Sequence, residues 1–99
     1  MTNELLALIA TYFACSEVAA ERHLTSSEVH QCATVYQEVK FAFLPGVGID
    51  DYVHLSDPEK GVANRAAFLA FHTWRQTNPD LVKRLERAAR GEGPLPKAG

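Results

Sequence analysis

Two cysteines carry the most reactive side chains in this sequence. Cys15 and Cys32 each lie about eight residues from a short corner at His23-Leu24. If the two flanking segments are paired helices, the thiols sit at the same height. A disulfide needs Cα atoms within about 7 Å, whereas packed helices lie about 8–10 Å apart. We therefore expect two reduced, buried thiols, and a redox pair is the alternative.

Metal binding and nucleophilic catalysis have little support in the spacing of the polar residues. His30 and Cys32 are two positions apart, so on a helix they point away from each other. The 99 residues contain no CxxC, HxxxH or serine-elbow motif. Asp50 and Asp51 suit a solvated loop better than a cation site. We expect no metal, no cofactor, no catalytic residues and no enzymatic activity.

Three cationic or imidazole side chains share one side of a predicted helix: Arg65, His72 and Arg75. Two guanidinium groups and an imidazole at helical spacing could bind a carboxylate or a phosphate. We favour a structural role instead, in which Arg65 pairs with Asp50 or Asp51. A small anionic-ligand binder or an enzyme at this place is the least favoured function.

The charges are distributed unevenly along the chain. Residues 1–59 hold nine acids and two bases, whereas residues 60–99 hold eight bases and three acids. We favour mutual neutralisation of the two halves over an acidic partner for the basic half. A net charge of −2 and a pI near 6.0 argue against a dedicated nucleic-acid binder. Weak nucleic-acid binding through a basic last helix is therefore the alternative function, with contacts from Lys83, Arg84, Arg87 and Arg90.

Capping signals divide the chain into four main helices. The first is predicted from Asn3 to about Arg22. A capping box at Thr25-Ser26-Ser27-Glu28 begins the second, which ends near Leu44. The two should form an antiparallel hairpin. Ser56-Asp57-Pro58-Glu59 begins the third, and Asn78-Pro79 separates it from a fourth that ends near Arg90.

These elements predict an all-α, single-domain bundle over residues 1–90, with a flexible tail over 91–99. An ordered loop, with a helical turn around Asp50–His54, joins the second and third helices. The third helix is apolar on three sides, which is typical of a helix buried all round, so we predict that it is the central post of the fold. Phe71 and Trp74 should then be largely buried.

The back of the first helix is the predicted interface. The stretch between Glu4 and Glu17 carries no charge. Small residues on a helical face allow close approach of another helix, and a second copy related by a two-fold axis is the simplest cover. The predicted contacts are Ala7, Ala10, Thr11, Ala14 and Val18.

The composition sets the functional class. A content of 46% hydrophobic and 22% charged residues is typical of a globular domain. No apolar run reaches the length of a membrane span, and the first residues lack the basic segment of a signal peptide. We expect a cytoplasmic, homodimeric protein-interaction module, such as a regulator, adaptor or assembly subunit. Its partner should be another protein or a second copy, with no membrane contact.

Overall fold

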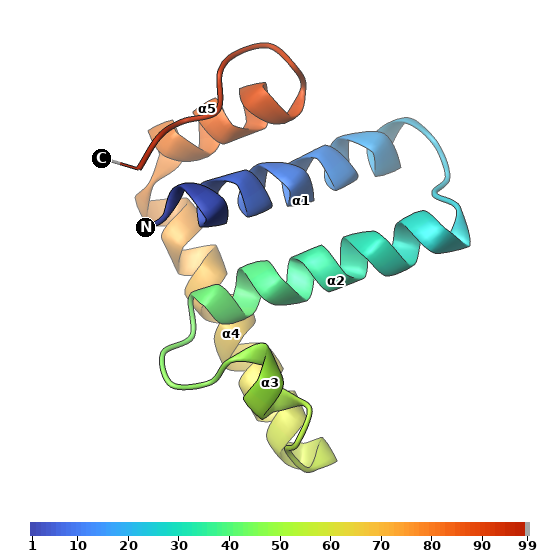
Figure 1. Cartoon of the computed structure of the whole chain (residues 1–99), viewed down its shortest axis with the longest axis vertical. Helices are drawn as coiled ribbons and strands as arrows, with labels where there is room; N and C mark the ends of the chain where they lie inside the picture. The colour runs from blue at the N-terminus through green and yellow to red at the C-terminus, as the bar shows by residue number, and fades with distance from the viewer. Residues whose placement is uncertain (99) are drawn as a thin grey trace.

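The computed structural model describes residues 1–98, which form five α-helices and no strand (Figure 1). This confirms the prediction of an all-α domain. Every predicted helix end lies within two residues of the observed one, and the predicted helical turn is the short helix α3. The helices are α1 (Asn3–Glu21), α2 (Ser26–Ala42), α3 (Ile49–Tyr52), α4 (Asp57–Thr77) and α5 (Pro79–Ala89).

Side-chain caps explain where the helices begin. Thr2, rather than Asn3, caps α1, because its hydroxyl accepts a hydrogen bond from the Leu5 amide at 3.0 Å. Capping boxes at Thr25/Glu28 and Ser56/Glu59 begin α2 and α4 as the sequence predicts. The side chains thus satisfy amide groups that the first turn of a helix leaves without a backbone partner.

The helices are arranged in two layers. In Figure 1, α5, α1 and α2 lie side by side, and α4 crosses one end of this layer with α3 beside it. The molecule measures 42 × 35 × 20 Å, and the shortest dimension equals about two helix diameters. The predicted antiparallel hairpin of α1 and α2 is present. Within this layer α1 lies between α5 and α2, whereas α4, the helix predicted to be the central post, lies across one end of the layer.

The main core lies where α4 crosses the layer. Phe71 of α4 is only 3% exposed, and its ring lies 5.4 Å from that of Phe43, the C-cap residue of α2. Trp74 packs against Phe43 at 5.1 Å but remains half-buried. The burial of Phe71 is therefore confirmed and that of Trp74 only in part. The buried residues of the main core are Leu6, Ile9, Phe13, Val39, Phe71, Val82 and Leu85.

The prediction that the third long helix is buried on all sides is wrong. Val62 is 73% exposed, Leu69 49% and Phe68 45%. The reason is geometric, since the layer, together with α3 and the loops beside it, covers only the side of α4 that carries Ala63, Ala67 and Phe71. Apolar residues around a helix show which side chains would gain from burial, but not how many neighbours the fold provides.

The C-terminal segment returns along the molecule towards the N-terminus (Figure 1). Gly91 has a φ of +73°, which allows the chain to reverse after α5. Pro96 is buried, and the Ala98 amide donates a 2.7 Å hydrogen bond to Asn3 Oδ1. The flexibility predicted for this tail, whose last residue lies outside the described residues, stays a prediction.

Candidate interaction surfaces

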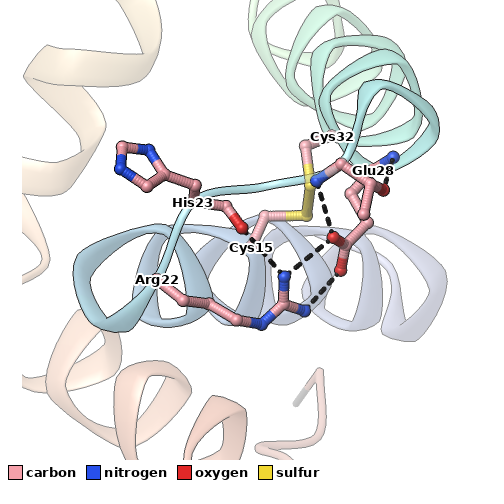
Figure 2. Close-up of polar contacts among 6 residues, drawn as sticks. Cys15, Arg22, His23, Glu28 and Cys32 are labelled. Carbon is pink, nitrogen blue, oxygen red and sulfur yellow. Dashed lines mark hydrogen bonds and ion pairs between the residues drawn. A yellow bond between two sulfur atoms is a disulfide. The ribbon is translucent and has the colours of Figure 1, made fainter.

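A disulfide joins Cys15 of α1 to Cys32 of α2 (Figure 2). The prediction of equal height is confirmed. The prediction of two reduced, buried thiols is wrong, because the two sulfur atoms are bonded and both residues are only half-buried. The error lies in comparing a Cα distance with an axis distance. Cα atoms lie about 2.3 Å from a helix axis, so facing Cα atoms are about 4–5 Å closer than the axes. The observed Cα–Cα distance is 6.0 Å.

An apolar groove of about 440 Å³ lies between α1 and α2 beside this disulfide. It contains three of the five predicted interface residues. The other two lie elsewhere: Ala10 packs against the main core, and Ala7 is half-buried. The face of α1 that was predicted as the interface is therefore only partly accessible to a partner. We call this feature the α1–α2 groove; its lining residues are Thr11, Ala14, Cys15, Val18, Leu24, Glu28, Gln31, Cys32 and Val35.

The closed end of the hairpin is held by an ion pair between Arg22 and Glu28 (Figure 2). The two guanidinium nitrogens donate to the two carboxylate oxygens at 2.9 and 2.6 Å. The same guanidinium donates to the His23 carbonyl at 3.0 Å, and the Thr25 amide donates to the Glu28 carboxylate at 2.9 Å. The hydrogen bond from Arg22, above all, lowers the pKa of Glu28 to about 2. The pairing of Arg22 with Glu28 was not predicted from the sequence, although the capping box already placed Glu28 at the corner.

The side of α4 that faces away from the layer is apolar and uncovered. Val62 and Leu69 protrude from it, Thr73 is exposed, and Ala66 between them is half-buried. Next to it, the rings of Phe68 and His72 stack with centroids 5.8 Å apart. We call this surface the α4 outer face and define it by Val62, Ala66, Leu69 and Thr73.

The three residues of the predicted anion site do not converge. Arg75 lies over the Phe13 ring, 5.0 Å from its centroid, so its cation–π contact faces the core. His72 and Arg75 line one shallow depression with Lys83, but Arg65 does not take part in it. Within residues 1–98 Arg65 forms no ion pair, so the predicted pairing with Asp50 or Asp51 is wrong.

The basic residues of α5 and of its C-cap position, Arg90, divide into two groups. Arg90 is held in the structure, with its guanidinium 3.5 Å from Glu17 and 3.1 Å from Glu92. Arg87 donates to the Glu92 carbonyl at 3.3 Å. The contact between Arg90 and Glu17 is the one ion pair, among the residues the structure describes, that links the acidic and basic halves of the chain. Lys83 and Arg84 are exposed and form no ion pair within that part of the chain.

The burial of Lys40 was not predicted from the sequence. Lys40 is only 8% exposed, and its ammonium group donates to Asn64 Oδ1 at 3.0 Å and lies 4.5 Å from the centre of the Tyr36 ring. Asn64 in turn donates to the Tyr52 hydroxyl at 2.9 Å. Burial lowers the pKa of Lys40. This network connects α2, α3 and α4, and the position of Lys40 between two apolar residues, Val39 and Phe41, was its sequence signal.

No family model, no curated protein and no solved structure matches this chain. The geometry of the chain itself therefore carries the functional argument. Across residues 1–98, no three His, Cys, Asp or Glu side chains gather as a metal site would require. In the same residues, no helix is long and apolar enough to cross a membrane.

Proposed function

We propose that this protein is a small helical protein-interaction module, a regulator, adaptor or assembly subunit without enzymatic activity of its own. One observation carries the proposal. The chain exposes 6496 Å², about 900 Å² more than the roughly 5,600 Å² expected of a compact monomer of 10.9 kDa. Each partner of a standard protein–protein interface contributes about 800 Å². The excess is thus of the size that one interface would bury.

The exposed area includes two apolar surfaces, the α1–α2 groove and the α4 outer face. Burial of such surfaces releases water, and contacts of this kind drive most protein association. Of the five residues predicted to contact a partner, three line the groove and stay in the proposed interface: Thr11, Ala14 and Val18. Ala10 is excluded from a direct contact because it already packs against the core.

A cytoplasmic location remains part of the proposal on one condition. Structural disulfides persist in oxidising compartments and are rare in the reducing cytoplasm. The bond between Cys15 and Cys32 must therefore be transient there, formed and reduced as conditions change. Trapping of free thiols in intact cells would detect a mixture of both states. Complete and permanent oxidation would place the protein in an oxidising compartment instead.

The proposal is tested by comparing the parent with two surface variants. Ala14→Arg places a charge in the α1–α2 groove, and Leu69→Glu places one on the α4 outer face. Ala33→Glu, at an exposed site of α2, is the matched control. The parent should either self-associate at high micromolar concentration or retain a stoichiometric partner, and one surface variant should lose this association while the control keeps it. A monomeric parent without a stoichiometric partner would contradict the proposal.

Nucleic-acid binding is the second candidate, because Lys83 and Arg84 of α5 are exposed and form no ion pair within residues 1–98. With Arg87 they could neutralise about three phosphates, for which the logarithm of the binding constant should fall with the logarithm of salt at a slope of roughly −3. Fluorescence anisotropy with a labelled duplex would measure this slope. The double variant Lys83→Glu/Arg84→Glu should abolish binding, and absence of binding by the parent at low salt would exclude the function.

A further inference from the structure

We propose that the redox state of Cys15 and Cys32 decides whether the end of the α1–α2 hairpin is ordered, and with it whether the α1–α2 groove exists. The disulfide holds this end together, and its reduction by a small thiol lets the end open. The inference gives the groove a regulation, and that part rests on the proposed function. The change of order does not depend on it.

The end of the hairpin has no hydrophobic core of its own. We define the hairpin end as residues 14–34, which are the last part of α1, the corner and the first part of α2. Within this range no residue is buried, and none packs against the main core or against the smaller cluster of Phe41, Ala63 and Ala67. Helices in proteins owe most of their stability to the packing of an apolar face. The hairpin end therefore lacks the contribution that stabilises the rest of the fold.

Two ion pairs also reach the hairpin end, and both are exposed. Arg22 pairs with Glu28 across the corner, and the guanidinium of Arg90 lies 3.5 Å from the carboxylate of Glu17. The side chains of these four residues are 32% to 54% exposed. Exposed ion pairs are weakened by the surrounding water and add little to stability. The disulfide is thus the strongest link between the two helix ends (Figure 2).

The covalent bond limits how far the hairpin end can open. It joins residues 17 positions apart, and a loop of this size changes the equilibrium between the folded and the opened chain by roughly a hundredfold. Loss of this factor opens the hairpin end first, because packing contributes least to its stability. The main core, where α4 crosses the layer, keeps its buried residues.

A small thiol can reach the bond, because both cysteines are half-buried and line the α1–α2 groove. The thiolate of a reductant such as glutathione attacks one sulfur, the S–S bond breaks, and the other cysteine leaves as a thiolate that takes up a proton. A second glutathione thiolate then attacks the mixed disulfide and releases the remaining cysteine. Two electrons have passed to the protein, and the two glutathione molecules leave joined by a disulfide.

The groove depends on an ordered hairpin end. All of its lining residues except Thr11 and Val35 belong to residues 14–34. They come from α1, from Leu24 at the corner and from α2, so the groove requires both helix ends at their observed separation. Opening of the hairpin end moves these two walls apart. Reduction therefore removes the groove, whereas the α4 outer face, whose helix packs on the main core, remains.

NMR chemical shifts of the Cα atoms measure the order of each residue in the two redox states. In the oxidised parent, the four long helices should all show helical shifts. After reduction with dithiothreitol, residues 14–21 and 26–34 should lose their helical shifts, while Leu6, Ile9 and Phe71 should keep theirs. Helical shifts that persist in the hairpin end after reduction would overturn the inference. So would a loss at Phe71 as well, because the bond would then hold the whole fold.

Two variants distinguish the bond from the reductant and from the ion pair. Cys15→Ser/Cys32→Ser should show the reduced pattern both with and without dithiothreitol. Arg22→Gln removes the ion pair with Glu28 and keeps the bond, so its hairpin end should stay helical until the bond is reduced. If the hairpin end of oxidised Arg22→Gln lost its helical shifts, the ion pair and not the bond would hold it, and the inference would be overturned.

The inference and the proposed function fail in different ways. A hairpin end that stays helical after reduction, in a protein that self-associates or retains a stoichiometric partner, overturns only the inference. A hairpin end that opens on reduction, in a protein that never associates, supports the inference and contradicts the proposed function.

Association measured in both redox states tests the regulation of the groove. If Ala14→Arg abolishes the association of the oxidised parent, the groove is the interface, and reduction of the parent should weaken its association at least about tenfold because few molecules then have an ordered groove. An association that Ala14→Arg abolishes but reduction leaves unchanged would show that the groove survives reduction, and would overturn the inference.

Discussion

At the scale of single residues, the carboxylate of Glu28 makes the stability of the fold depend on pH. Its pKa in the folded protein is about 2, against an ordinary value of 4.5. Because folding lowers this pKa, its stabilising contribution is complete above about pH 4.5 and disappears as the pH falls through about 2. Chemical denaturation between these values should show a steeper loss of stability for the parent than for Glu28→Gln.

A direct titration provides the control for this prediction. NMR should follow Glu28 in the folded protein and find its midpoint near 2, well below the ordinary carboxyl value of 4.5. If Glu28 titrated at an ordinary carboxyl value, the bidentate contact with Arg22 would not be maintained in solution.

Lys40 is the second residue whose environment leads to a prediction. Its charge is buried and has a neutral amide, Asn64, as its hydrogen-bond acceptor. Lys40→Met keeps most of the packing volume and removes the buried charge, so it should change the free energy of unfolding by less than about 1.5 kcal/mol. Lys40→Ala also removes the packing and should cost about 2 kcal/mol or more.

Urea denaturation of the two Lys40 variants separates charge from packing. Folding lowers the pKa of this ammonium group, so the parent should become more stable as the pH rises through the range below 10.5. Lys40→Met should lack that increase. Equal destabilisation by both substitutions would mean that the charge itself, through its hydrogen bond to Asn64, holds α2 to α4.

At the scale of elements, the disulfide fixes the end of the α1–α2 hairpin that lies farthest from α4. It joins residues 17 positions apart, and a loop of this size should stabilise the fold by about 3 kcal/mol by restricting the unfolded chain. Cys15→Ser/Cys32→Ser should therefore unfold at a lower denaturant concentration, as should the reduced parent. Unfolding without reductant should release no free thiol, and two thiols per chain would contradict the bond.

In this protein, local sequence signals specify where a helix begins better than they specify which other elements pack against it. Thr25, Ser56 and Pro79 act within one helical turn, so the sequence predicts where α2, α4 and α5 begin. The exposure of Val62 depends on where the layer of α5, α1 and α2 ends. That limit is a tertiary property with no local signal. For the same reason Ala10 was assigned to the interface together with Ala14, although Ala10 packs against the main core and only Ala14 lines the groove.

At the scale of the whole molecule, the shape explains why an apolar helix face stays open. The Cα radius of gyration is 14.1 Å, against about 12.6 Å for a compact chain of 99 residues. Three helices spread in one layer and α4 crosses only one end of it, so the core is small and the surface large (Figure 1). A partner bound at the α1–α2 groove or at the α4 outer face would cover part of this open surface.

Hydroxyl-radical footprinting is the sharpest test of the proposed association, because it reads the exposure of single side chains in the unmodified protein. Either Val62 and Leu69 of the α4 outer face or Val18 and Val35 of the α1–α2 groove should become protected, at high micromolar concentration or when the partner is added. Val29 and Val53 are comparably exposed, at 52% and 56%, and lie outside the α4 outer face, so their reactivity should stay constant. If all four side chains reacted equally fast at every concentration, with and without a partner, the proposed interaction function would be contradicted.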